Sequence, residues 1–417
     1  MAPELFLAVT LIGACFTFNA YLPQRAFGAM VVPSFFAGWL TSELVGHHFA
    51  WQLLATVGFV AAGALERWPG WLGLAITLAS WAGLYGLAVR AERASDSVEA
   101  ALRDDLGEGY RDAIDPALAT RIEQPLHPGR RLVPFLLFDP EVRRIGALPY
   151  APEHGARGEL DVYVPRSGAS RAPVLFQIHG GGWIIGDKRQ QGLPLMLQAA
   201  RAGWVCVAAN YRLSPKATFP DHLIDVKRAL AWIRQHIAEY GGDPNLVCVT
   251  GGSAGGHLSS MLALSANDPE YQPGFEDVDT SVAACVPFYG VYDWTNSTQR
   301  QKHGGMESVV ERMILKTPLA THRKEWEKSS PLFRVHPGAP PFFVIHGSHD
   351  SLASVEEGRL FVERLREVSQ APVCYAEIPG AQHAFEIFHS KRTTHVVRAV
   401  ERFLGWVVTR ERSHRAA

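Results

Sequence analysis

The stretch from residue 246 to residue 264 constrains the fold more than any other part of the chain. An apolar, β-branched run over Leu246–Thr250 enters GGSAGG at residues 251–256, and Leu258–Leu264 continues with the spacing of a helix. A Gly-x-Ser-x-Gly motif between a strand and a helix is typical of a sharp turn that holds its serine in a strained, exposed position. A glycine-rich loop is the simpler alternative, but the flanking strand and helix patterns favour Ser253 as a nucleophile.

A second glycine cluster supports this interpretation. HGGGW occupies residues 179–183 directly after Val174–Ile178, an apolar run typical of a buried strand. Three consecutive glycines carry a conformational-entropy cost unless the backbone must approach another group closely. Their unhindered N–H groups are suited to the negative oxygen that develops when a serine attacks a carbonyl. Together the two motifs predict a serine hydrolase.

A nucleophilic serine needs a base and a carboxylate that orients the base, and α/β-hydrolases carry them in the chain order Ser, Asp or Glu, His. Pro341–His346 predicts a strand that ends shortly before Asp350, and Val373–Ile378 predicts another that leads into a loop with His383. We therefore predict Asp350 as the orienting acid and His383 as the base. The alternatives are that His383 is an ordinary loop histidine, one of seventeen in the chain, and that Asp350 belongs to a polar helix start or a solvated face.

The sequence around these motifs alternates between strand and helix patterns. Further strands are expected at Leu160–Val164, Val205–Asn210 and Val282–Tyr289, with helices at about 190–202 and 221–239. Such alternation indicates a mostly parallel sheet with helices on both faces. Residues 291–336 form a polar insertion that contains aromatic residues. Four aromatic side chains in or beside it either line a substrate pocket or serve ordinary packing: Tyr289, Tyr292, Trp294 and Trp326.

These motifs resemble those of the hormone-sensitive-lipase family of α/β-hydrolases, which includes bacterial esterases and relatives of arylacetamide deacetylase. The resemblance covers roughly residues 158–408 and rests on HGGGW, GGSAGG, the turn with Asp350, and GAQHAF at 380–385. It implies Ser253 as nucleophile, His383 as general base and Asp350 as its partner. It further implies an oxyanion hole made by the N–H groups of Gly181, Gly182 and Ala254. The chain departs from the family in two places, with Gly252 where an acid usually precedes the nucleophile and with a shorter acidic turn, HGSHDSL.

The first 89 residues differ sharply from the rest in charge. They contain five charged side chains, whereas the remaining 328 residues contain 76. Four apolar stretches at about 5–22, 26–42, 49–65 and 71–89 each approach the length of about 17–25 residues that spans a bilayer as a helix. A cleaved signal peptide is one alternative, but Glu4 stands where basic residues are expected and further apolar stretches follow. The other is a buried helical domain of a soluble protein, which would show charges at helical intervals.

These patterns predict three parts of the chain: a transmembrane domain of about four spans over 1–92, a connector with a lead-in helix over 93–157, and a catalytic domain over 158–412 with a cap insertion at about 291–336. Arg90, Arg93 and Arg103 give a slight excess of positive charge on the catalytic side of the predicted membrane, so the positive-inside tendency favours a multi-pass protein with a cytoplasmic catalytic domain. Nothing in the sequence specifies an oligomeric state.

Several partner and cofactor classes are not expected. The net charge of −1 and the absence of a basic stripe argue against nucleic acid. The five cysteines form no CxxC or Cys/His spacing, so they are interpreted as core residues and no metal site is expected. The glycine clusters lack the Lys-Ser/Thr ending of a phosphate-binding loop.

The sequence thus predicts a membrane-anchored serine carboxylesterase or lipase that acts on a small-molecule or lipid ester through an acyl-enzyme, without a cofactor. An amide or formamide hydrolase is the first alternative. A non-catalytic membrane scaffold with a hydrolase fold is the second.

Overall fold

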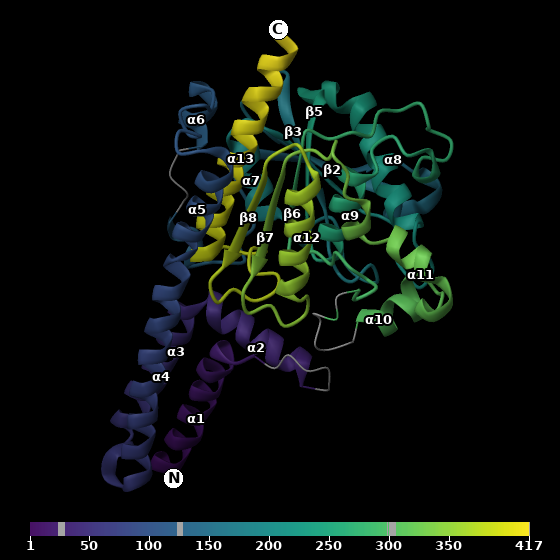
Figure 1. Ribbon diagram of the computed structural model, residues 1–417. Helices are drawn as coiled ribbons and strands as arrows, with labels where there is room; N and C mark the ends of the chain where they lie inside the picture. The colour runs from purple at the N-terminus through teal and green to yellow at the C-terminus, as the bar shows by residue number, and fades with distance from the viewer. Residues whose placement is uncertain (24–29, 123–127, 298, 300–305, 417) are drawn as a thin grey trace.

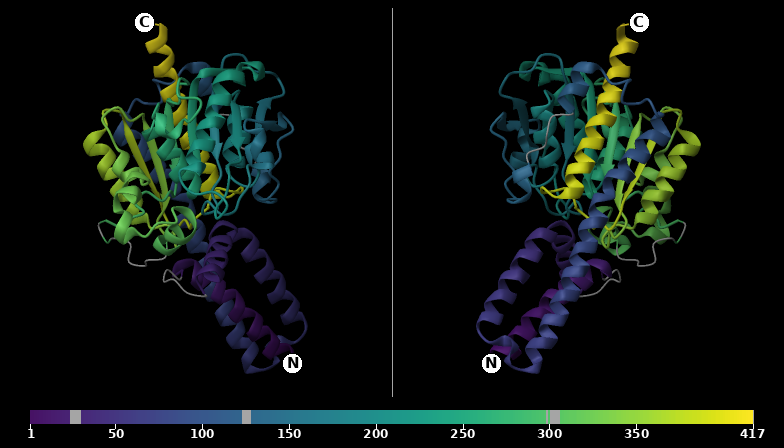
Figure 2. Two further views of the ribbon diagram at one scale, coloured as in Figure 1. Left: turned by 90° about the vertical axis from the view of Figure 1, so that its right-hand side faces the viewer. Right: turned by 90° about the vertical axis from the view of Figure 1, so that its left-hand side faces the viewer.

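The computed structural model describes residues 1–23, 30–122, 128–297, 299 and 306–416. It contains an α/β domain and a bundle of N-terminal helices that projects from one end of that domain (Figures 1 and 2). Arg25, the first four residues of the predicted span 26–42, and residues 298 and 300–305 of the predicted insertion lie outside the described residues.

The α/β domain is built on one sheet of eight strands in the order β1-β2-β4-β3-β5-β6-β7-β8. The strands are β1 Val142–Pro149, β2 Glu159–Pro165, β3 Ala172–Ile178, β4 Val205–Ala209, β5 Gly242–Gly252, β6 Ala284–Phe288, β7 Phe342–Gly347 and β8 Val373–Ile378. The pairs β1–β2 and β2–β4 are antiparallel, and all pairs from β4 to β8 are parallel. This architecture confirms the predicted fold class.

Helices cover both faces of the sheet because its central strands are apolar on both sides. In β3, Val174, Phe176 and Ile178 belong to one hydrophobic core, whereas Leu175 points into the other. The first core is covered by α8 Asp221–His236, α9 Ala254–Leu264 and α12 Val355–Val368. The second is covered by α5 Ala94–Leu106, α6 Pro116–Ile122, α7 Leu193–Arg201 and α13 Lys391–Ala416. The two sets are visible on opposite sides in Figure 2.

Two parts of the predicted connector 93–157 contribute to the α/β domain, which corrects its description as a lead-in. Strand β1 forms the edge of the sheet, and Val98 and Leu102 of α5 are buried in its second core. The sequence did not reveal β1 because most of its side chains are exposed and prolines flank it, so it lacks an apolar alternation. Within the predicted insertion, the described elements are α10 Met306–Val309, a single π-helical turn at Val310–Ile314, α11 Leu319–Lys328, and a 3₁₀ turn at Pro331–Arg334.

The N-terminal region contains α1 Ala2–Tyr21, α2 Val31–Glu43, α3 Val45–Ala61 and α4 Trp68–Glu92. Among the described residues, two helices are long and apolar enough to cross a membrane: α1, and the helical stretch from Trp68 that continues through α5 to Leu106. A third candidate exists only if α2 and α3, which are bent by 92° at their junction, count as one span. Helix α2, with 13 residues, reaches only about 20 Å and turns away from α3, so it is too short to count as a span by itself. The described residues therefore supply two or three of the four predicted spans.

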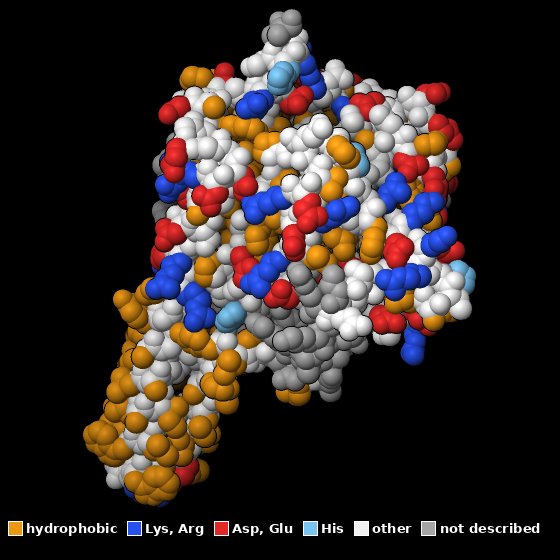
Figure 3. Space-filling model, in the orientation of Figure 1, with side chains coloured by type: hydrophobic (Ala, Val, Ile, Leu, Met, Phe, Trp, Pro, Cys, Tyr) orange, Lys and Arg blue, Asp and Glu red, His pale blue; other side chains and the backbone are white. Residues whose placement is uncertain are grey.

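Small and polar residues hold this bundle together internally. The hydroxyls of Thr17 and Ser80 lie 2.8 Å apart between α1 and α4, and the Tyr21 hydroxyl donates to the Gly83 carbonyl over 2.7 Å. Outside, the bundle is covered with apolar side chains, whereas charged side chains are spread over the α/β domain (Figure 3). Small residues and interhelical hydrogen bonds inside an apolar exterior are typical of helices that pack in lipid.

Candidate active site

All predicted site residues follow the carboxyl ends of parallel strands. HGGGW follows β3, Ser253 follows β5, Asp350 follows β7, and His383 follows β8. Because the carboxyl ends of parallel strands meet at one edge of a sheet, residues up to 204 positions apart are brought to the same edge. The N-terminal helices attach to this edge through contacts with the loop of His383, which are described below.

Ser253 occupies the turn between β5 and α9 with φ 59° and ψ −121°. A serine in this backbone region is strained, as expected for a nucleophile turn. The turn is tight because the helix passes close to β3: a Cβ placed on Gly255 would lie 2.1 Å from the Ile178 carbonyl oxygen. The N–H of Ser253 donates to the Phe288 carbonyl of β6 over 3.0 Å, which fixes the turn against the sheet.

Asp350 and His383 form a buried hydrogen-bonded pair. The distance between His383 Nδ1 and Asp350 Oδ2 is 2.7 Å. The other carboxylate oxygen of Asp350 accepts the backbone N–H groups of Leu352 at 2.9 Å and Ala353 at 2.8 Å. His346 adds a further contact, with Nε2 at 3.3 Å from Asp350 Oδ2. The carboxylate is therefore held in one orientation by its own turn while it faces the imidazole.

The electrostatics of this pair favour an ionised acid. Burial by itself would raise the pKa of Asp350, but His383 and His346 more than offset it and hold the pKa below its ordinary value. With an ionised Asp350 accepting at Nδ1, the hydrogen-bond network assigns the proton of neutral His383 to Nδ1. That assignment leaves Nε2 as the basic nitrogen.

Tyr289, directly after β6, lies against both His383 and Gly252, the residue before Ser253. Its ring centroid lies 4.4 Å from that of His383. Its hydroxyl lies so near the residue before Ser253 that a Cβ on Gly252 would approach it to 2.6 Å. One tyrosine thus packs against the turn of Ser253 and against the predicted base, His383. No hydrogen bond joins the Ser253 side chain to His383 among the described residues; such catalytic contacts are often long in unliganded enzymes.

Tyr289 also explains the departure at Gly252. Any side chain at that position would collide with the tyrosine, so an acid there has no room. A carboxylate from another loop contacts this tyrosine instead: the Tyr289 hydroxyl lies 2.5 Å from both oxygens of Glu386. Burial raises the pKa of Glu386 to about 7. Sequence reasoning missed Glu386; its only signal is an acid three residues after His383.

Two of the three glycines of HGGGW have positive φ, 109° at Gly181 and 60° at Gly182. The Gly180 N–H donates to Gln191 Oε1 over 2.7 Å, which anchors the loop. A Cβ on Gly180 would lie 3.1 Å from the Cβ of Ser253, so this loop adjoins the nucleophile turn. The N–H groups of Gly181, Gly182 and Ala254 have no hydrogen-bond partner among the described residues.

The other aromatic residues considered as pocket walls serve packing. Trp294 is buried and stacks on His257 with ring centroids 4.5 Å apart, and Tyr292 stacks on Phe361 at 4.3 Å. Trp326 is fully buried and donates to the Thr317 carbonyl over 3.1 Å. Of the four, only Tyr289 contacts a predicted site residue by ring packing.

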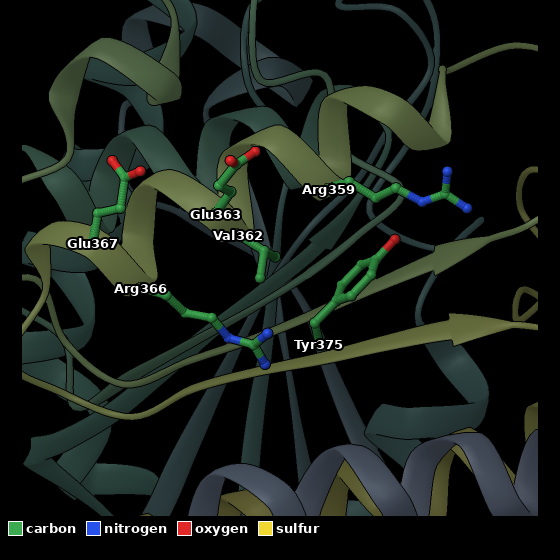
Figure 4. A pocket seen from close by; sticks show the side chains of 6 residues that line it. All are labelled: Arg359, Val362, Glu363, Arg366, Glu367 and Tyr375. Carbon is green, nitrogen blue, oxygen red and sulfur yellow. The ribbon is translucent and has the colours of Figure 1, made fainter.

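A surface depression between α12 and β8 contains none of the predicted site residues (Figure 4). Its lining consists of Arg359, Val362, Glu363, Arg366, Glu367 and Tyr375. Its arginines already have carboxylate partners, because Arg359 pairs with Glu377 and Arg366 pairs with Asp105, each at 2.7 Å. The arginines of the depression therefore offer no uncompensated positive charge to a ligand. Within the described part of the chain, no group of three His, Cys, Asp or Glu side chains is arranged to hold a metal ion.

Comparisons with known proteins agree with this architecture. The family model described as BD-FAE matches residues 160–365. The probable carboxylic ester hydrolase LipM of Mycobacterium tuberculosis is 43% identical over 409 residues, which cover 96% of this chain and 93% of the relative. Esterase LipQ of the same organism is 41% identical over 334 residues, covering 79% of this chain and 78% of the relative.

Among solved structures, a truncated carbohydrate esterase from gut microbiota has the same fold, with a TM-score of 0.54, 21% identity, and coverage of 63% of this chain and 96% of that structure. Because the match to LipM covers 96% of this chain, it includes most of the N-terminal helices as well as the α/β domain. On these observations, the chain belongs to the α/β-hydrolase family of carboxylic ester hydrolases that LipM and LipQ represent.

Proposed function

We propose that this protein hydrolyses carboxylic esters through an acyl-enzyme on Ser253. The observation that carries the proposal is the 2.7 Å hydrogen bond from His383 Nδ1 to the buried Asp350, at the same sheet edge as the strained turn of Ser253. A base whose Nδ1 is occupied in this way has Nε2 left to accept the serine proton.

In the first half of the reaction, His383 Nε2 removes the proton from Ser253 Oγ while Oγ attacks the ester carbonyl. The carbonyl oxygen becomes an oxyanion and accepts hydrogen bonds from the N–H groups of Gly181, Gly182 and Ala254. The intermediate then collapses: the bond to the alkoxy oxygen breaks, His383 gives its proton to the departing alcohol, and the acyl group remains on Ser253.

In the second half, His383 removes a proton from water, and the resulting hydroxide attacks the acyl carbonyl. Collapse releases the carboxylic acid and returns the proton to Ser253 Oγ. Asp350 remains ionised throughout, and it stabilises the imidazolium that forms twice in each cycle.

The proposal includes a membrane anchor formed by α1 and α4, which leaves the α/β domain beside the bilayer. Their apolar exteriors and polar interior contacts support this arrangement. The excess of arginine at the end of α4 and in α5 favours a cytoplasmic α/β domain, and protease digestion of sealed vesicles tests that side.

Replacement of the nucleophile tests the chemistry. Ser253→Ala is expected to lower kcat for a chromogenic short-chain ester by about 10⁴–10⁶-fold and to abolish labelling by a fluorophosphonate, with the melting temperature unchanged. The matched control is Ser259→Ala on the same helix, because that buried hydroxyl donates to the Gly256 carbonyl over 3.1 Å and lies behind the turn. Turnover retained by Ser253→Ala contradicts the assignment.

A further inference from the structure

Helix α2 of the N-terminal region packs directly on the loop that carries the proposed base. The ring of Phe35 meets that of His383 edge-on, with centroids 6.4 Å apart and an interplanar angle of 70°. Phe35 stacks on Trp39 at 5.6 Å, and Trp39 contacts Phe388 at 5.1 Å. Phe35, Trp39 and Phe388 form a small hydrophobic cluster of their own, separate from the two cores of the sheet. A helix outside the α/β domain therefore supplies an aromatic wall beside His383.

A buried ion pair holds α2 in this position. Arg392, at the start of α13, donates to Glu43 Oε1 over 2.7 Å and to the Ser42 carbonyl over 2.9 Å. Ser390 donates to the other oxygen of Glu43 over 2.8 Å. The side chains of Arg392 and Glu43 are at most 1% exposed. Buried ion pairs add little net stability but can specify one register. Arg392 also donates to the Pro379 carbonyl over 3.1 Å, so the same side chain fixes the start of the His383 loop.

A neighbouring face of α2 is exposed and apolar, and its Phe36 packs against Phe35 at 5.0 Å and against Trp39 at 6.1 Å. We define the entry surface as the side chains of Val32, Phe36, Leu132, Val133, Phe135 and Leu136, which are 48–78% exposed. The segment from 132 to 136 is tied to the helical region and to the base loop: His47 Nε2 lies 3.2 Å from the Leu132 carbonyl, and the Phe135 ring lies 4.8 Å from that of Phe388. Water is a poor solvent for six such side chains in one place.

The orientation of α2 indicates that lipid covers the entry surface. Because α2 is bent by 92° from α3, it runs across the bundle where the bundle meets the α/β domain (Figure 1). If α1 and α4 cross a bilayer, α2 then lies along the membrane surface. A helix in that position buries its apolar face in the boundary between headgroups and acyl chains. The exterior of the bundle is apolar as well (Figure 3), which supports the same occupant.

We propose that α2 is the membrane-side wall of the substrate site, and that the substrate is an ester of a bilayer-resident lipid. The entry surface rests in the lipid boundary, the ester passes from it along α2 towards Ser253, and Phe35 contacts the acyl chain next to His383. Such a path spares the acyl chain an exposure to water, which costs free energy for each methylene group. The inference rests on the proposed function, since it assumes ester hydrolysis at Ser253.

The test compares two esters on the full chain reconstituted in phosphatidylcholine vesicles: a water-soluble chromogenic acetate and a long-chain ester embedded in the vesicles. Phe35→Ala is expected to lower kcat/KM for the embedded ester by about tenfold more than kcat/KM for the acetate, with the additional loss mainly in KM. Phe35→Leu is expected to restore most of the loss, because a leucine keeps an apolar contact.

The double variant Val32→Asn/Leu136→Asn tests the entry surface independently of the packing around His383. It is expected to show the same selective loss on the embedded ester. Phe333→Asn is the control, because Phe333 is 42% exposed on the α/β domain outside the entry surface, and both activities are expected to remain. Equal losses on the two esters, or no loss on the embedded one, overturn the inference. Acetate hydrolysis that does not depend on Ser253 overturns the proposed function instead.

Discussion

The α/β domain and the N-terminal helices distribute the same kinds of side chain in opposite ways. In the domain, the central strands are buried and apolar, and charges lie on the surface. In the helical region, Leu54 is 73% exposed and Phe18 is 65% exposed, whereas the polar side chains of Thr17 and Ser80 are buried. The two regions are therefore organised for different solvents.

This difference determines what stabilises each region. Removal of apolar surface from water drives the sheet and its covering helices together. Lipid provides no such force between helices, so α1 and α4 depend on close packing and on contacts such as that between Thr17 and Ser80. Because the active site lies where the two regions meet, it depends on both.

The largest expected effect concerns ester hydrolysis, for which all the proposed catalytic residues belong to the α/β domain. Asp350→Asn is expected to lower kcat by about 10³–10⁴-fold with little change in KM, because an amide favours the wrong tautomer of His383. Steady-state kinetics with a soluble ester measure it. Glu66→Gln is the control, since Glu66 is an acid of the helical region that lies in the connection between α3 and α4. A comparable loss of kcat in Glu66→Gln would contradict the assignment of catalysis to the α/β domain alone.

A second prediction concerns the two solvents. Leu258→Ala, in the core of the α/β domain, is expected to lower the free energy of unfolding by about 2–5 kcal/mol. Leu54→Ala, an exposed leucine on α3, is expected to cost less than about 1 kcal/mol. Chemical denaturation in detergent, followed by loss of esterase activity and by tryptophan fluorescence, measures both.

The same position on α3 also tests the membrane contact itself. Leu54→Arg is expected to reduce the membrane-bound fraction of the protein, because a charge in the bilayer interior costs about 2.5–3.5 kcal/mol on insertion scales. Fractionation of cells measures this outcome. A fully membrane-bound Leu54→Arg protein would show that α3 does not face lipid.

The smallest expected effect concerns a buried carboxyl group in the α/β domain, whose charged side chains otherwise lie mostly on the surface. Glu401 on α13 is buried, and burial raises its pKa to about 8. Since the folded protein binds this proton more tightly than the unfolded chain, the contribution of the group to stability is present below about pH 4.5 and is lost as the pH rises to 8. Glu401→Gln is therefore expected to gain on the order of 1–2 kcal/mol relative to the native protein between pH 5 and pH 8. Thermal unfolding at the two pH values measures the gain, with Glu411→Gln on the same helix as the control.

Sequence patterns predicted the elements that form the centre of the sheet. The predicted strands at 174–178 and 246–250 lie within β3 and β5, and the strand predicted at 373–378 coincides with β8. Their apolar side chains are buried on both faces, which produces a strong local signal. Strand β1 gave no such signal, because an edge strand with exposed side chains lacks the pattern. The bend of 92° between α2 and α3 could not be predicted for a related reason, because apolar composition does not show a bend between two helices.

The candidate site divides in the same way. Ser253, Asp350 and His383 were identified from short motifs, and the structure joins Asp350 to His383 through a hydrogen bond. Their catalytic roles remain predictions. The pairing of Tyr289 with Glu386 and that of Glu43 with Arg392 could not be inferred, because 97 and 349 residues separate the partners and neither pair belongs to a local motif.

By itself, the sequence determined that this chain has a parallel α/β core, a serine turn after one strand, and an apolar N-terminal region, because each of these depends on side-chain patterns that are local in the chain. Only the tertiary structure decided that α2 turns away from α3 and rests against the loop of His383. That arrangement depends on the packing of Phe35 and on the burial of Glu43 with Arg392. These contacts join distant segments, so their free energy exists only in the folded chain.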